Sequence, residues 1–118
     1  MTTFLVASDA RWVRDQVRGA FVSRDQRVVE VTRGQDVRDA FAREQPDLVI
    51  LDLQIGNMGG IATCHAIRNE AAAERLDDVQ VMLLLDRPDD RWLAGTSGAD
   101  GWMVKPLDPF RLRRATRA

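Results

Sequence analysis

Five short, mostly apolar runs, each followed by a segment of helical character, constrain the fold of this chain more than any other feature. The runs read TFLVA at 3–7, RVVEV at 27–31, LVIL at 48–51, VMLLL at 81–85 and WMV at 102–104. Such runs are typical of strands buried on both faces. Strands that alternate with helices form a parallel sheet with helices on both faces. The sequence therefore predicts an α/β fold around a parallel sheet.

The segments between these runs have the spacing of amphipathic helices. In the first of them, Val13, Val17, Ala20 and Phe21 recur at i, i+4, i+7 and i+8. The predicted helices span 10–21, 35–44, 60–73 and 89–97, with Ile61, Cys64, Ile67 and Ala71 facing inward in the third. A last helix follows Asp108, which can cap its N-terminus.

Composition excludes several classes of protein. The chain has 118 residues, enough for one domain, and it is 45% hydrophobic, which suffices for a core. Its net charge of −1 lacks the positive excess of a nucleic-acid binder. One cysteine cannot form an internal disulfide, and no stretch approaches the roughly 20 apolar residues of a membrane span. We expect a soluble, cytoplasmic domain that contacts neither nucleic acid nor membrane.

Three charged residues follow predicted strands. Asp9 ends the first strand, Asp52 ends the third and most apolar one, and Lys105 ends the fifth. In parallel sheets, ligands bind at the carboxyl ends of the strands. Two close carboxylates repel each other, and Mg²⁺ relieves that repulsion and also binds phosphate oxygens. A carboxylate there can act as a nucleophile towards a phosphoryl group, with a lysine neutralising its charge.

Three segments, FLVASD, PDLVILDLQIGNMGG and GADGWMVKP, resemble the response-regulator receiver domain of two-component signalling. The resemblance covers essentially the whole chain. It implies a flavodoxin-like (βα)5 fold, a doubly wound five-stranded parallel sheet of strand order 2-1-3-4-5. We therefore expect a single receiver domain over residues 1–118 with no output domain.

The resemblance also implies a role for individual residues. Asp52 would accept the phosphoryl group, and Mg²⁺ would bind Asp9, Asp52 and the backbone carbonyl of Gln54. Lys105 would face the phosphate, with a cis peptide bond before Pro106. Trp102 falls at the aromatic switch position. Trp12, three residues after Asp9, should report Mg²⁺ binding.

The sequence departs from the family pattern at both ends of the site. Ser8 stands where the family has a first acid, so Mg²⁺ should bind more weakly. Leu85 stands where the family has Ser or Thr, and it cannot donate a hydrogen bond to a phosphoryl group. Asp86 would add negative charge there, and the segment from 85 to 98 is slightly short. These departures bear on the switch more than on the acceptor.

Other residues favour structural roles. His65 is expected to face solvent on its helix, and Cys64 to fill the core. Arg111, Arg113, Arg114 and Arg117 suit a helix C-terminus, although they could also contact an acidic partner or nucleic acid. Trp92 and Trp102 could form an exposed patch that mediates a homodimer.

Two functional hypotheses remain. In the first, a sensor histidine kinase or phosphotransfer protein phosphorylates Asp52, and the domain signals to a downstream protein, with at most weak autodephosphorylation. In the second, a degenerate receiver acts as an interaction module without phosphorylation, which Ser8 and Leu85 favour. An aspartyl phosphatase would usually need an acid at position 54, which is Gln54. A flavin carrier would need a phosphate loop after Ala7, which is missing.

Overall fold

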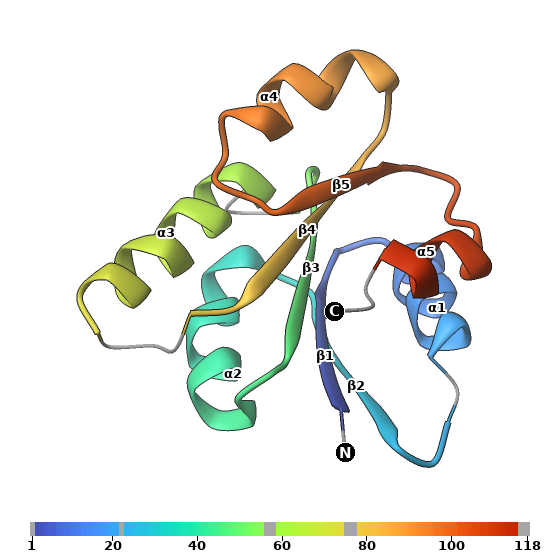
Figure 1. The fold of residues 1–118 in the computed structure, drawn as a ribbon, viewed down its shortest axis with the longest axis horizontal. Helices are drawn as coiled ribbons and strands as arrows, with labels where there is room; N and C mark the ends of the chain where they lie inside the picture. Colours follow the sequence, from blue (N-terminus) through green and yellow to red (C-terminus); the bar gives the residue numbers. More distant parts are fainter. Residues whose placement is uncertain (1, 22, 56–58, 75–77, 116–118) are drawn as a thin grey trace.

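The fold alternates strands and helices along the whole chain. A computed structural model of the protein describes residues 2–21, 23–55, 59–74 and 78–115. The strands are β1 (Thr2–Ala7), β2 (Gln26–Val31), β3 (Leu48–Asp52), β4 (Gln80–Leu85) and β5 (Gly101–Val104). The helices are α1 (Arg11–Ala20), α2 (Val37–Glu44), α3 (Gly60–Ala72), α4 (Arg91–Gly95) and α5 (Pro109–Ala115). Figure 1 shows them arranged around one central sheet.

The sheet has five parallel strands in the order β2-β1-β3-β4-β5. This confirms the predicted flavodoxin-like fold and its strand order 2-1-3-4-5. Strand β3 is central, with every residue buried, and it pairs with β1 on one side and β4 on the other. The register sets Asp52 opposite Leu84 of β4. The carboxyl end of β3 therefore lies between two neighbouring strands.

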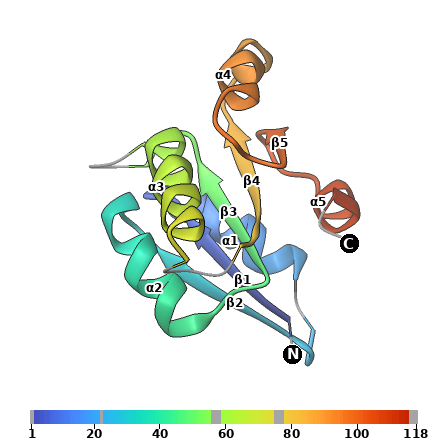
Figure 2. The ribbon, with the colours of Figure 1, turned by 60° about the vertical axis from the view of Figure 1, so that its left-hand side comes forward.

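Alternating side chains divide the core into two layers. Leu5, Val49 and Leu51 pack with buried residues of α2 and α3 on one face of the sheet. Val6 and Ile50 pack on the other face with buried residues of α1 and α5. In Figure 2, α2 and α3 lie on one side of the sheet and α5 on the other. Because successive strand residues point to opposite faces, apolar strands need helices on both sides.

Two predicted helices differ from the structure at their ends. The helix predicted from residue 35 begins as a 3-10 turn at Gly34–Asp36, and the one predicted over 89–97 is a 3-10 turn, Pro88–Asp90, followed by the short α4. The hydroxyl of Ser97 donates to the carbonyl of Ala94, 2.6 Å away, and so helps to end α4 early. The Asp108 carboxylate accepts the backbone N–H of Phe110 at 2.9 Å, which confirms it as a cap of α5. No helix in the described part of the chain is long and apolar enough to span a membrane.

Candidate functional site

Asp52 is held on both carboxylate oxygens. It is the last residue of β3 and only 1% exposed. Oδ1 accepts the backbone N–H of Gln54 at 3.0 Å and lies 2.5 Å from Nζ of Lys105. Oδ2 accepts the hydroxyl of Ser8 at 2.7 Å. A buried carboxylate needs such partners because an unpaired buried charge is very costly.

Lys105, the only lysine of the chain, is the cation of the site. Its side chain is 7% exposed, and its Nζ lies 2.9 Å from Oδ1 of Asp86 as well as close to Asp52. Burial alone would lower the pKa of Lys105, but the hydrogen bonds to Asp52 and Asp86 outweigh burial and raise it. Nζ also lies 6.0 Å from the ring centroid of Trp12. The peptide bond between Lys105 and Pro106 is cis, as the resemblance implied.

Ser8 has a role that the sequence reading missed. The residue is fully buried, and besides donating to Asp52 its Oγ accepts the backbone N–H of Ala10 at 3.1 Å. We interpreted Ser8 in the sequence only as the loss of a carboxylate. Its hydroxyl instead links the end of β1 to the end of β3. A small polar residue after a buried strand was the signal available for this contact.

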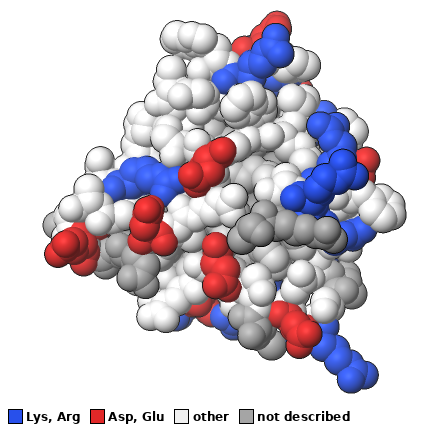
Figure 3. All heavy atoms as spheres, viewed as in Figure 1, with Lys and Arg blue, Asp and Glu red and all other residues white. Residues whose placement is uncertain are grey.

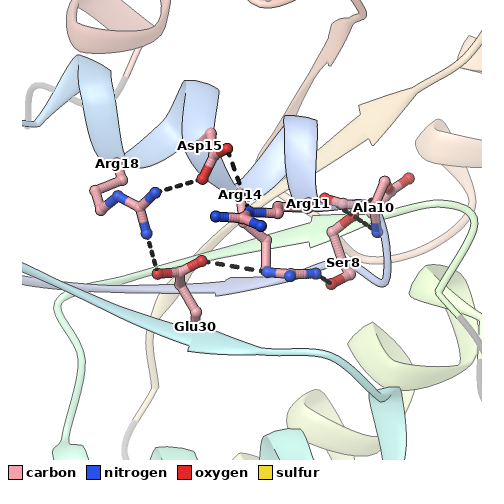
Figure 4. A network of polar contacts seen from close by, with 8 residues as sticks. Ser8, Ala10, Arg11, Arg14, Asp15, Arg18 and Glu30 are labelled. Carbon is pink, nitrogen blue, oxygen red and sulfur yellow. Dashed lines mark hydrogen bonds and ion pairs between the residues drawn. The ribbon is translucent and has the colours of Figure 1, made fainter.

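An ion-pair network on α1 and β2 supports the backbone at Ser8 (Figure 4). Nη1 of Arg14 donates to the carbonyl of Ser8 at 2.8 Å, and Nε of Arg14 donates to Glu30 at 3.2 Å. Arg18 reaches the other oxygen of Glu30 at 2.6 Å and also pairs with Asp15. Arg14 is the most enclosed arginine of this network, with a side chain 15% exposed against 52% for Arg18. The network therefore fixes the strand end that carries Ser8 and Asp9.

Asp9 is exposed just beyond β1. Within the described residues, no three His, Cys, Asp or Glu side chains gather into a group that could hold a metal ion. Mg²⁺ is usually bound through one or two carboxylates and keeps several waters. Asp52 and the exposed Asp9 supply two carboxylates at the carboxyl ends of neighbouring strands, the number that Mg²⁺ usually takes and one acid fewer than the family pattern, and both oxygens of Asp52 are already hydrogen-bonded.

Gly60 lets α3 begin close to the backbone of Asp52. A Cβ atom at Gly60 would lie 2.4 Å from the carbonyl oxygen of Asp52, far inside van der Waals contact. The Gly60 N–H also donates to the carbonyl of Leu53 at 3.2 Å. The start of α3 thus lies tightly against the end of β3, and Gly56, Asn57 and Met58 of the loop predicted over 54–59 lie outside the described residues.

The switch positions have contrasting environments. Leu85 is fully buried in β4, and its carbonyl accepts the backbone N–H of Lys105 at 2.8 Å. Asp86 follows it at the surface and turns its carboxylate to Lys105, a pairing that the sequence reading did not predict. Trp102 is 47% exposed on β5 and Trp92 is 73% exposed on α4. The expected exposed aromatic patch therefore has both tryptophans at the surface.

The remaining predicted residues lie away from Asp52. His65 is exposed, and Cys64 is a buried free cysteine whose thiol pKa is raised by burial. Arginines gather over α5 in Figure 3. Among them, Arg113 donates to the carbonyl of Ala20 at 3.1 Å, so it ties α5 to α1. Arg117 lies outside the described residues.

Comparisons with known proteins agree with this geometry. The model of the response regulator receiver domain family matches residues 4–117. An uncharacterized response regulatory protein of Mycobacterium tuberculosis is 34% identical over 116 residues, covering 93% of this chain and 84% of the relative. The transcriptional regulatory protein AfsQ1 of Streptomyces coelicolor is 29% identical over 120 residues, covering all of this chain but 51% of the relative. The probable transcriptional regulator ycf27 of Porphyridium aerugineum is 32% identical over 93 residues, covering 77% of this chain and 36% of the relative.

Solved structures share the fold over nearly the whole chain. Chemotaxis protein CheY4 of Vibrio cholerae superposes with a TM-score of 0.82 at 20% identity, covering 98% of this chain and 95% of that one. The magnesium-bound receiver domain of sensor histidine kinase PA1611 from Pseudomonas aeruginosa has a TM-score of 0.82 at 20% identity, covering 97% and 93%. With the family model spanning almost all residues, the sheet order as predicted and a buried aspartate paired with lysine at the strand ends, this chain belongs to the response regulator receiver domain family.

Proposed function

We propose that the domain accepts a phosphoryl group on Asp52 from a sensor histidine kinase or phosphotransfer protein, in a cytoplasmic, Mg²⁺-dependent phosphorelay. The observation that carries the proposal is the contact between Nζ of Lys105 and Oδ1 of Asp52, at 2.5 Å. A buried carboxylate with its own cation is suited to a reaction that brings more negative charge to the same place. Most other residues of the inner strands at this depth are apolar, so a paired charge there is unusual for a core position.

In the proposed transfer, a carboxylate oxygen of Asp52 attacks the phosphorus of the donor. A bond forms between that oxygen and phosphorus while the bond between phosphorus and the donor's nitrogen breaks, and the nitrogen keeps the electron pair and takes up a proton. Lys105 neutralises charge on the phosphoryl oxygens. Its pKa, raised by the two carboxylates, keeps it protonated at neutral pH. We expect at most weak loss of the phosphoryl group to water.

The residues proposed to hold Mg²⁺ are Asp9, Asp52 and the backbone carbonyl of Gln54. When bound, the ion would neutralise the carboxylates and bind a phosphoryl oxygen. Ser8 lowers the number of carboxylates and keeps one oxygen of Asp52 hydrogen-bonded. We therefore expect Mg²⁺ to bind weakly but still to support phosphoryl transfer to Asp52.

Labelling with a small phosphodonor tests the acceptor. Wild-type protein incubated with acetyl phosphate and Mg²⁺ should gain the mass of one phosphoryl group, and the gain should disappear with EDTA. Asp52→Asn should not be labelled. Asp39→Asn is the matched control, since the Asp39 side chain is 80% exposed on α2, away from the site. Equal labelling of wild type and Asp52→Asn would place the acceptor elsewhere.

A second function is favoured by Ser8 and Leu85: an interaction module that works without phosphorylation. Leu85 is fully buried in the apolar core beside α4, where the family has a hydroxyl. If neither acetyl phosphate nor a kinase labels the wild type, and Mg²⁺ leaves the tryptophan fluorescence unchanged, this second function holds.

The surface proposed to meet a downstream protein, or a second copy of the chain, is the α4 and β5 face. Trp92, Leu93 and Trp102 are exposed there by 73%, 40% and 47%. Tryptophan is enriched at binding hot spots, and an apolar patch of this kind marks an interaction site. Sedimentation of wild type against Trp92→Ala tests the homodimer. Dimers that form with rising concentration in wild type but not in Trp92→Ala support the homodimer. A wild type that stays monomeric at all concentrations argues for a different protein as the partner.

A further inference from the structure

We propose that Asp86 is a built-in counter-anion of Lys105 that slows phosphoryl transfer to Asp52 until it is displaced. This inference rests on the proposed function of the same site. Two carboxylates, Asp52 and Asp86, share one ammonium group, at 2.5 and 2.9 Å. The pairing joins three elements, because Asp52 ends β3, Asp86 follows β4 and Lys105 follows β5.

The two carboxylates differ in freedom to move. The side chain of Asp52 is 1% exposed and hydrogen-bonded on both oxygens, whereas that of Asp86 is 41% exposed. The neighbouring Arg87 donates a hydrogen bond to Asp90, at 3.1 Å, and interacts with Asp86 through its charge. Asp86 is therefore the partner that can leave Lys105 and turn to solvent.

Asp86 resembles a bound anion more than a metal ligand. It is engaged by a cation, and the described residues hold no group of three acidic, His or Cys side chains suited to a metal ion. An incoming phosphoryl group carries negative oxygens that need the same ammonium. Asp86 then both competes for Lys105 and repels the donor, so it must swing out before transfer.

The rate at which acetyl phosphate labels the protein, measured at saturating Mg²⁺, tests whether Asp86 slows phosphoryl transfer. Asp86→Ala and Asp86→Asn should be labelled by acetyl phosphate about three to ten times faster than wild type, the effect of losing a partly exposed ion pair and its repulsion. Asp89→Ala is the matched control, because Asp89 is an exposed acid in the 3-10 turn that follows Asp86. It should leave the rate unchanged. Where wild type is labelled, equal or slower labelling of both Asp86 variants overturns the proposal.

A second readout does not require phosphoryl transfer. Because Lys105 is the only lysine, protein grown with ¹³C-lysine gives one set of lysine side-chain NMR signals. Inorganic phosphate should shift these signals at a concentration at least threefold lower in Asp86→Ala than in wild type. An unchanged titration overturns the proposal even if wild type is labelled.

The two readouts separate the inference from the function beneath it. If no variant is labelled but phosphate binds more tightly to Asp86→Ala, Asp86 is the counter-anion of Lys105 and phosphoryl acceptance fails. If wild type is labelled and both Asp86 variants behave like it in both experiments, acceptance stands and the counter-anion role fails.

Discussion

Oγ of Ser8, the residue after β1, donates a hydrogen bond to Oδ2 of Asp52, the last residue of the neighbouring parallel strand β3, across 2.7 Å. In the family pattern an acid stands at position 8. A carboxylate there would face Asp52 with charge repulsion where the hydroxyl now makes a hydrogen bond. Serine at this position therefore makes the stability of the strand ends less dependent on a cation than an acid would, and a substitution can measure the difference.

Ser8→Asp should make stability depend on Mg²⁺. In EDTA we expect a loss of about 1–3 kcal/mol in the free energy of unfolding, since a hydrogen bond to a buried carboxylate is replaced by repulsion. Mg²⁺ should recover much of this loss and bind more tightly than in wild type. Thermal unfolding with and without Mg²⁺ measures both effects. Ser8→Ala, which loses the hydrogen bond without adding charge, is the control. A Mg²⁺ response no larger than that of wild type would mean that position 8 does not line the ion site.

Stability should fall at alkaline pH through Lys105. The folded pKa of Lys105 is raised above the ordinary 10.5: burial opposes the shift, and the hydrogen bonds to Asp52 and Asp86 outweigh it. A raised lysine pKa contributes stability that is complete below the unfolded pKa and is lost as pH rises through the folded pKa. The unfolding free energy of wild type should thus decline above pH 10.5, as measured by urea denaturation.

Lys105→Met separates this effect from that of Cys64. Burial raises the pKa of the Cys64 thiol above its ordinary 9.0. The free energy of unfolding therefore also declines as pH rises because of Cys64, and this decline begins at a lower pH than the decline due to Lys105. The Met variant keeps the cysteine and loses only the lysine component. At neutral pH it should be about 3 kcal/mol less stable, because the Asp52 carboxylate stays buried without its cation. The chain has no tyrosine to add a third alkaline titration. A decline above pH 10.5 that is identical in both proteins contradicts the assignment.

Gly60→Ala should disturb the acceptor through the backbone. Its Cβ would meet the carbonyl oxygen of Asp52 at 2.4 Å, so either α3 or the end of β3 must shift. We expect a loss of about 1–3 kcal/mol, typical of overpacking, measured by denaturant unfolding. Gly19→Ala, in α1 with nothing within 4 Å of the new Cβ, should instead stabilise by about 0.5–1 kcal/mol. Equal effects of the two substitutions would show that the close approach is unimportant.

Arg14→Gln should weaken the site from a distance. It removes the donor to the Ser8 carbonyl and one partner of Glu30, which loosens the segment carrying Asp9. We expect a loss of about 1 kcal/mol in stability, together with weaker Mg²⁺ binding by fluorescence titration. Arg18→Gln is the control, since Arg18 pairs with the same Glu30 but is 52% exposed and does not contact Ser8. Equal Mg²⁺ affinity in the two variants would confine the role of Arg14 to folding.

Much of the fold followed from the apolar runs because the three inner strands, β1, β3 and β4, are buried on both faces, whereas the edge strands β2 and β5 are only partly buried. The runs at 48–51 and 81–85 are apolar without interruption, and both are central strands in the structure. Helix ends were harder to predict, as with α4, whose early end depends on a side-chain contact of Ser97 rather than on a pattern. Asp52 and Lys105 could be brought together from sequence because parallel strands share one carboxyl edge.

The finer contacts of the site depend on which rotamer a side chain adopts, and no pattern in the sequence encodes that. Ser8 and Asp86 were recognisable as departures, but each was read as a loss or a disturbance. In the structure each makes a specific hydrogen bond, one to Asp52 and one to Lys105. The link from Arg14 to the Ser8 carbonyl spans six residues and needs the known path of α1 before it can be proposed.

Strand β3 is bonded to β1 and β4 along its length and is buried at every residue. Its amide protons should therefore be among the last in the chain to exchange with solvent. Because β3 is held on both sides, we expect its backbone to move little when Asp52 is covalently changed. Any structural response must then arise from side chains at the edge of the sheet and from the turn between β4 and α4. Its signature would be a change in the amide-proton exchange rates of that turn, with the rates of β3 unaltered.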